Sequence, residues 1–288
     1  MGVAFCGLEL AHPVVNASGT FDVPAARAAF GEALDAEFPF SAFVSKTITL
    51  KPRDGNPPPR LWEAPAGLIN SIGLPNKGLE SYLEHDLPEL ARLPVPLITN
   101  VMGSTASEIA TLLERCEERP EIAALELNVS CPNVETGLDI GAEPATLEAV
   151  VHEVRPRTSK PLIVKLTPNT ADVASCALAA EAGGADAVSL INTLRALALA
   201  PEMRSAPRAP WLGGGSGGLS GPAIRAVALV QVAAAARAVT IPVVGMGGVQ
   251  RAAHARDLLD VGATLVAVGT ESFRDPAAGG LIARALAG

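Results

Sequence analysis

The chain has 288 residues, of which 49% are hydrophobic and only 3% aromatic, and its formal net charge is −8. This length suits one large α/β domain with a core built from Ala, Val, Leu and Ile. The acidic balance argues against a nucleic-acid backbone as the partner, because binding to phosphates requires clustered Lys and Arg.

The sequence contains no segment typical of a signal peptide or a membrane span. Residues 1–13 lack a basic leader and soon reach His12 and Pro13. The most apolar stretch, residues 226–249, is interrupted by Arg237, Pro242 and several glycines. We therefore expect a cytoplasmic protein that does not bind membranes.

Short runs of Val, Ile and Leu alternate along the chain with segments of helical character, which predicts a parallel sheet with crossover helices. Residues 4–17 are typical of a short hairpin outside this sheet. The expected barrel strands are residues 42–46, 67–70, 96–100, 123–128, 161–165, 187–191, 241–245 and 264–268. The expected helices are residues 104–118, 145–155, 170–182, 222–237 and 251–260.

This order of elements predicts a (β/α)8 barrel formed by a single domain over residues 1–288, with a short N-terminal β-hairpin. The connection between the first two expected strands, residues 47–66, is rich in proline and not helical. It departs from strict β/α repetition, and we expect it to be an inserted loop at the C-terminal face.

Polar residues or glycines end nearly every expected strand. In a β/α barrel these positions meet on one face, where active sites are built. One such residue is compatible with an ordinary strand exit, whereas a nearly complete set indicates a site. The residues concerned are Lys46, Asn70, Asn100, Asn128, Lys165, Asn192, Gly247, Gly248, Gly269 and Thr270.

Two glycine-containing loops, "GMGGV" at residues 245–249 and "VGT" at residues 268–270, follow the last two expected strands. Glycine lets backbone N–H groups approach an anion closely, and barrels often bind phosphate at these loops. The pattern predicts a phosphate-bearing cofactor or substrate, although tight turns also need glycine. A third glycine-rich segment, residues 213–224, is either a loop tip or another anion cradle, with Gly221 as the expected contact.

Lys46 and Lys165 end very apolar strands. They either extend to the barrel rim to reach water or stabilise negative charge on a ligand or a reduced cofactor. Asparagine is common in turns, but four of them near one barrel mouth suit a flat polar ligand such as a pyrimidine ring. These four are Asn70, Asn128, Asn133 and Asn192.

The cysteines are Cys6, Cys116, Cys131 and Cys176, and none forms a CxxC pair. We expect neither a structural zinc site nor disulfides. None of the four histidines lies at a strand end, which leaves Cys131, within "LNVSCPN", as the candidate proton-transfer group. A thiol pKa of about 8.5 suits acid–base catalysis near neutral pH. The alternative is a purely structural thiol.

Taken together, these motifs resemble the dihydroorotate dehydrogenase family. The matching segments span nearly the whole chain in family order: "NASGTF", "SKTITLKPRDGNPPPR", "GLINSIGLPNKG", "NVSCPN", "VKLTPN", "INTL", "GGLSGPA", "GMGGV" and "VGT". The resemblance implies a flavin enzyme on a β/α barrel, with FMN at the C-terminal ends of the strands. It also implies oxidation of dihydroorotate to orotate in pyrimidine synthesis.

The resemblance assigns Cys131 as the base that removes a proton from the substrate ring while a hydride passes to FMN, and it places Lys165 near the flavin ring. The implied substrate-binding residues are Lys46, Asn70, Ser71, Ile72, Gly73, Leu74, Asn128, Asn133, Asn192 and Thr193. The implied FMN contacts are Ala17, Ser18, Gly19, Lys46, Thr47, Asn100, Asn128, Lys165, Ile191, Gly221, Gly247, Gly248, Gly269 and Thr270.

Cysteine rather than serine at position 131 resembles the soluble class of the family, which has two subtypes. "SGTF", "TNVMG", "NTL", "GGLSGPA" and "GMGGV" resemble the subtype that passes electrons to NAD, whereas "NSIGLPN" resembles the homodimeric, fumarate-linked subtype. The first group implies a homodimeric core in a heterotetramer with an electron-transfer subunit that carries FAD and a 2Fe–2S cluster. Residues 195–216 depart from both subtypes.

Two other functions fit the same residues. A related flavin barrel acting on another pyrimidine, such as uracil or thymine, would use the same asparagines. Lys46 and the backbone amides of residues 71–74 favour a substrate with a carboxylate instead. A non-catalytic barrel that binds a phosphate-bearing ligand is the third possibility, but it leaves Cys131 and the two lysines without a task.

Overall fold

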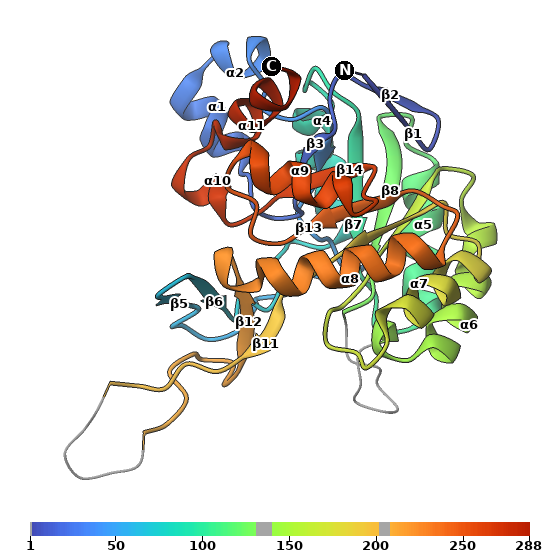
Figure 1. The fold of residues 1–288 in the computed structure, drawn as a ribbon. Coiled ribbons are helices and arrows are strands. Elements are labelled where there is room, and N and C mark those ends of the chain that lie inside the picture. Colours follow the sequence, from blue (N-terminus) through green and yellow to red (C-terminus); the bar gives the residue numbers. More distant parts are fainter. Residues whose placement is uncertain (1, 131–139, 202–207) are drawn as a thin grey trace.

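The computed structural model describes residues 2–130, 140–201 and 208–288. Within them, eight strands form a parallel sheet that curls into a nearly closed barrel (Figure 1). In spatial order the strands are β3 (Val14–Asn16), β14 (Leu265–Val268), β13 (Val243–Met246), β10 (Ala187–Leu190), β9 (Leu162–Lys165), β8 (Ile122–Asn128), β7 (Leu97–Val101) and β4 (Phe43–Val44). The expected (β/α)8 barrel is confirmed.

Helices surround this barrel. They are α1 (Val23–Phe30), α2 (Ala33–Ala36), α3 (Leu79–Ser81), the π-helix η1 (Tyr82–Asp86), α4 (Leu87–Leu90), α5 (Ala106–Glu117), α6 (Pro144–Val154), α7 (Val173–Ala182), α8 (Arg225–Ala238), α9 (Ala252–Asp260), α10 (Glu271–Arg274) and α11 (Ala278–Ala287). Short 3-10 turns are η2 (Ile140–Ala142), η3 (Arg155–Arg157) and η4 (Pro222–Ile224). In the described part of the chain, no helix is long and apolar enough to cross a membrane.

The five expected helices are confirmed as α5 to α9, with ends shifted by a few residues. The sequence pattern did not predict α1 to α4, α10 and α11. In α11 the signal was weak because Gly279 and Gly280 lie in its first turn, and glycine disfavours helix. The close packing of Gly279 against Phe40 explains its presence, since a Cβ there would lie 2.3 Å from the Phe40 ring.

Two strand assignments were wrong. Residues 67–70 form β6 (Gly67–Asn70), which lies outside the barrel in a small antiparallel sheet with β5 (Leu61–Ala64), β12 (Gly217–Ser220) and β11 (Leu194–Ala196). The first barrel strand is β3, within the segment that we expected to be an outlying hairpin. Parallel strands need a long, usually helical, crossover. Helices α1 and α2 supply it between β3 and β4, whereas residues 47–66 contain no helix.

The expected N-terminal hairpin is confirmed as β1 (Val3–Phe5) and β2 (Leu8–Leu10). Phe5 and Leu10 are almost fully buried and belong to the cluster of apolar side chains inside the barrel. Figure 1 shows this hairpin at one end of the barrel and the small sheet of β5, β6, β11 and β12 at the other. The hairpin therefore closes the N-terminal end, and the C-terminal end stays available for a site.

Side chains alternate between the inside of the barrel and the helix layer, as expected for barrel strands. In β8, Leu125 and Leu127 pack against the helices, whereas Ala124 belongs to the interior cluster. Glu126 and Asn128 share the alternation of Ala124 and therefore face the interior. The interior is thus apolar toward the hairpin and polar toward the C-terminal ends of the strands.

The seam between β3 and β4 is closed by a side chain rather than by a strand ladder. The amide nitrogen of Asn16 donates to the Val44 carbonyl at 2.7 Å, and its amide oxygen accepts from the Val44 N–H at 2.8 Å. Asn16 is fully buried. Beside it, both the backbone N–H and the hydroxyl of Ser41 donate to the Val14 carbonyl, at 3.0 and 3.1 Å. The Asn16 side-chain amide thus makes the two hydrogen bonds to Val44 that a peptide group of a neighbouring strand would otherwise make.

We expect Asn16→Ala to lower the free energy of unfolding by about 2–4 kcal/mol, because it leaves a buried N–H and a buried carbonyl of Val44 without partners. Urea denaturation followed by circular dichroism measures this change.

The matched control is Ser41→Ala on the same seam. The Val14 carbonyl keeps its bond from the Ser41 backbone N–H in that variant, so we expect a loss below about 1 kcal/mol. Equal losses in the two variants would contradict the closing role of Asn16.

Candidate functional site at the C-terminal face of the barrel

A polar layer lies inside the barrel near the ends of β7, β8, β9 and β10. The Asn100 amide nitrogen donates to one Glu126 carboxylate oxygen at 2.5 Å, and the Ser189 hydroxyl donates to the other at 2.7 Å. Lys165 is 6% exposed and forms no ion pair with any described carboxylate. Its register partners are Asn128 on β8 and Ser189 on β10. A lysine buried to this extent without a carboxylate partner favours an anionic or electron-rich ligand nearby.

The residues after β3 and β4 form one side of the barrel mouth. The Ser18 hydroxyl donates to the Ser45 carbonyl at 2.8 Å and lies 3.4 Å from the Thr47 hydroxyl. Lys46, which lies between Ser45 and Thr47 in the sequence, is exposed. It lies close to Gly19, since a Cβ atom added to Gly19 would be 3.8 Å from the Lys46 Cγ. The two segments that sequence analysis assigned to one cofactor are therefore adjacent.

The three glycine-containing segments meet at the mouth beside the residues that follow β3, because β14 is the neighbour of β3 in the sheet. A Cβ on Gly248 would lie 3.0 Å from the Gly221 carbonyl oxygen, and one on Gly221 would lie 3.6 Å from Thr270. The Thr270 hydroxyl donates to that of Ser220 at 2.8 Å. Gly221, Gly247 and Gly248 have φ angles of +91°, +131° and +70°, which side chains rarely adopt.

These segments present backbone donors that the protein itself does not use. The N–H groups of Gly247, Gly248, Gly269 and Thr270 make no hydrogen bond within the described residues. Successive free N–H groups at the ends of neighbouring strands form an anion-binding concavity. The two loops also connect to the rest of the mouth, since a Cβ on Gly247 would lie 3.4 Å from Ile191 and one on Gly269 would lie 3.5 Å from Ala17. The arrangement fits a phosphate group.

A pocket of about 160 Å³ opens beside the barrel mouth. Its lining residues are Ser130, Asn169, Asn192, Thr193, Arg195, Ser216, Gly217 and Gly218. Among these, only Asn192 and Thr193 were expected from the sequence as site residues. Asn169 and Gly217 lie within the motifs "VKLTPN" and "GGLSGPA", so they could have been found. Arg195 and Ser216 are the first and last residues of the segment that departs from the family pattern, and nothing in the sequence indicated that they line a pocket.

Two of the predicted asparagines hold one residue of this pocket. The Asn128 amide oxygen accepts from the Ser130 N–H at 3.1 Å, and the Asn192 amide nitrogen donates to the Ser130 hydroxyl at 3.0 Å. Asn70 reaches the same pocket from the small sheet, because its amide nitrogen donates to the Gly218 carbonyl at 3.2 Å. Asn70, Asn128 and Asn192 are thus brought together, although Asn70 comes from outside the barrel.

The loop after β6 follows an unusual backbone path, with φ angles of +75° at Gly73 and +54° at Leu74. The Ser71 N–H donates to the Arg60 carbonyl at 2.8 Å and is therefore engaged within the protein. The N–H groups of Ile72, Gly73 and Leu74 make no hydrogen bond within the described residues. Three free donors in succession suit a carboxylate.

Cys131 and Asn133 lie outside the described residues. Cys6, Cys116 and Cys176 are free thiols. Burial raises the pKa of Cys116 to about 12 and that of Cys6 to about 11, so both remain protonated at neutral pH. Cys116 and Cys176 lie in the core between the strands and the helices, as expected of small apolar residues.

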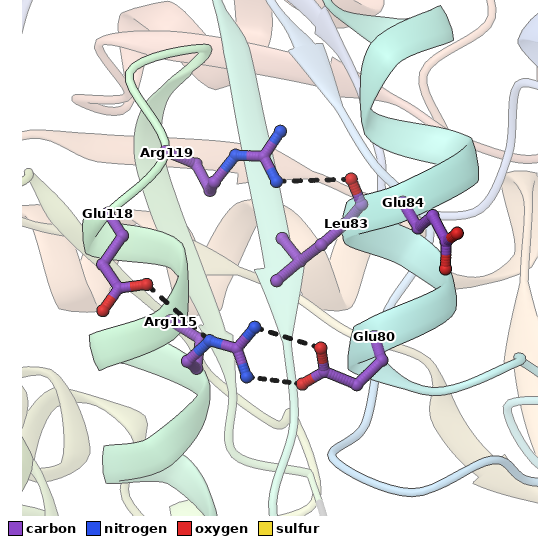
Figure 2. Close-up of a pocket in the computed structure, with 6 residues that line it drawn as sticks. All are labelled: Glu80, Leu83, Glu84, Arg115, Glu118 and Arg119. Atoms are coloured by element: carbon purple, nitrogen blue, oxygen red, sulfur yellow. Dashed lines mark hydrogen bonds and ion pairs between the residues drawn. The ribbon is translucent and has the colours of Figure 1, made fainter.

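A second pocket, of about 250 Å³, lies between α3–η1 and the C-terminal end of α5, and none of its lining residues belongs to the mouth described above (Figure 2). Arg115 forms two hydrogen bonds with Glu80, at 2.5 and 3.0 Å, and Arg119 donates to the Leu83 carbonyl at 3.3 Å. Arg115 also forms an ion pair with Glu118, and Arg119 forms one with Glu121. Ion pairs at an exposed surface contribute little to stability. We assign it no chemistry.

The family model described as dihydroorotate dehydrogenase matches residues 1–287. Similar proteins include the catalytic subunit of dihydroorotate dehydrogenase B (NAD(+)) from Desulforudis audaxviator, 47% identical over 285 residues, or 98% of this chain and 89% of the relative. Subunits of the same name from Pelobacter propionicus and Trichlorobacter lovleyi are 46% and 45% identical over 287 residues, or 99% of this chain and 92% of each relative. With matches over almost the entire barrel and its mouth, the chain belongs to the dihydroorotate dehydrogenase family.

Proposed function

We propose that the chain is the catalytic subunit of an NAD-linked dihydroorotate dehydrogenase, which oxidises dihydroorotate to orotate in de novo pyrimidine synthesis. The observation that carries this proposal is the amide-lined pocket around Asn192 and Ser130 beside a cradle of free backbone N–H groups. Relatives that match almost the whole chain carry this activity in their names.

FMN is the cofactor that we propose for the barrel mouth, and when bound it supplies the hydride acceptor. The free N–H groups at Gly247, Gly248, Gly269 and Thr270 would hold its phosphate, next to Gly221. Further proposed contacts are Ala17, Ser18, Gly19, Lys46, Thr47, Asn100, Asn128, Lys165 and Ile191. Burial without an anionic partner suits Lys165 to stabilise negative charge on a bound electron acceptor.

Dihydroorotate has a ring with alternating N–H and C=O groups and a carboxylate. Side-chain amides carry both a donor and an acceptor, which suits Asn70, Asn128, Asn133 and Asn192 to hold the ring together with Thr193. The exposed ammonium of Lys46 and the free N–H groups of residues 72–74 suit the carboxylate.

Cys131 is the proposed base that takes a proton from the substrate ring. Support comes from Ser130, the preceding residue, which lines the pocket and is held by both Asn128 and Asn192. Those asparagines would then orient the ring that loses the proton.

We propose that electrons leave through a partner subunit that contains FAD and a 2Fe–2S cluster and that reduces NAD, in a heterotetramer around a homodimeric core. The relatives' names, which include NAD(+) and "catalytic subunit", support this acceptor over fumarate.

Purification of the chain with its native partners tests the function. We expect a yellow protein whose flavin absorbance is bleached by dihydroorotate and not by dihydrouracil, with iron–sulfur and FAD signals and NAD reduction. A colourless chain that binds no FMN would refute the proposed chemistry. A homodimer containing only FMN and reducing fumarate would refute the NAD-linked subtype alone.

For Cys131→Ser we expect turnover near neutral pH to fall on the order of 10²-fold or more, because a serine hydroxyl is a much weaker acid than a thiol. Bound flavin should remain stoichiometric, as measured by the visible spectrum. Turnover equal to that of the wild type would remove the assignment of Cys131 as the base.

Gly218→Ala tests the substrate pocket. A Cβ at Gly218 would lie 1.9 Å from the Thr193 hydroxyl oxygen, so Thr193 must move. We expect KM for dihydroorotate to rise at least about tenfold while flavin content is unchanged. Gly280→Ala in α11 is the control, because its Cβ would meet nothing closer than 3.4 Å. An unaltered KM in Gly218→Ala would contradict a substrate contact by Thr193.

A further inference from the structure

Glu126 is a buried carboxylate for which the proposed reaction has no use. It is 4% exposed, lies on β8 and faces the barrel interior. Its two oxygens accept from the Asn100 amide nitrogen at 2.5 Å and from the Ser189 hydroxyl at 2.7 Å. Carboxylates are rarely buried to this extent, and the two oxygens here are engaged by β7 and β10, which lie on either side of β8 in the sheet.

The contact with Glu126 fixes which way the Asn100 amide is turned. A carboxylate only accepts hydrogen bonds, so the group of Asn100 that meets it must be the NH2. The backbone of Asn100 is held as well, because its N–H donates to the Ser45 hydroxyl and its carbonyl accepts from the Ile48 N–H, both at 3.0 Å. Both the backbone of Asn100 and the NH2 group of its side chain are therefore held in place.

The amide oxygen of Asn100 is consequently turned away from Glu126. It is fully buried and has no hydrogen-bond donor within the described residues. Buried polar atoms are nearly always paired in native proteins, so an oxygen left free at the mouth of a ligand-binding barrel indicates a donor on the ligand.

We propose that Glu126 is a positioning residue: it holds the Asn100 amide so that the oxygen, and not the NH2, is offered to the cofactor. The site then selects a ring that carries an imide N–H at this point. This inference rests on the proposed function, in which the isoalloxazine ring of FMN provides such an N–H.

A double-mutant cycle on FMN affinity tests it, with the dissociation constant measured by quenching of flavin fluorescence on titration of the apoprotein. Glu126→Leu frees the amide to rotate, and we expect the dissociation constant to rise about tenfold. Asn100→Ala removes the oxygen itself. In the Asn100→Ala background, Glu126→Leu should add less than about twofold, because it acts only through Asn100.

Two further variants separate orientation from general packing. Glu126→Gln retains an oxygen that accepts from the Asn100 NH2, and its own NH2 donates to the Ser189 hydroxyl, so FMN affinity should stay within about threefold. Ser189→Ala removes the hydrogen bond from the Ser189 hydroxyl to Glu126 and leaves the bond from Asn100. FMN affinity in this variant should also stay within about threefold of the wild-type value. Should Glu126→Leu not fold, Glu126→Ala gives the same comparison, since it also lacks an acceptor.

The proposal would be overturned if Glu126→Leu raised the dissociation constant for FMN by the same factor in the wild-type and Asn100→Ala backgrounds. It would also be overturned if Glu126→Gln weakened FMN binding as much as Glu126→Leu does. Wild-type apoprotein that binds no FMN would overturn the proposed cofactor and this inference together. If instead FMN binds and the effects of Glu126→Leu and Asn100→Ala simply add, the proposed cofactor stands and only the positioning role of Glu126 is refuted.

Discussion

The closed shape of the barrel depends on the side chain of Asn16. Strands β3 and β4 share no ladder, and its amide supplies to Val44 the donor and the acceptor that a neighbouring strand would otherwise provide. The residues that follow these two strands, Ala17 to Gly19 and Lys46 to Thr47, form one side of the mouth. The same interaction that closes the fold therefore brings together two segments of the candidate cofactor site.

Inside the barrel, polarity changes along the axis. The hairpin β1–β2 closes one end with Phe5 and Leu10, and apolar side chains fill the interior above it. Near the C-terminal ends of the strands the side chains become polar, with Glu126 and Lys165 as buried charged residues. A rigid apolar base thus supports the polar groups, and the glycine loops around them leave backbone N–H groups exposed to a ligand.

Local patterns were sufficient to predict much of this arrangement. Buried strands alternating with helices predicted the barrel, and polar strand ends predicted which residues gather at its mouth. β6 was misassigned because a short apolar run gives no indication of its pairing partner. The role of Glu126 was not predictable for a different reason. Its partners Asn100 and Ser189 are 26 and 63 residues away, and nothing in "LELN" distinguishes it from a glutamate exposed to solvent.

In the small sheet, β12 is paired on both sides, so Gly218 lies opposite Asn70 on β6 and opposite Arg195 on β11. A shift of one residue in β12 would turn its side chains to the other face and disturb both walls of the pocket at once. The number of residues within these three strands is therefore constrained. The described residues 197–201 and 208–215 lie between β11 and β12, outside these two ladders, so a change in their number would not by itself shift the register of β12. Most of residues 195–216, which depart from the family pattern, fall in this connection.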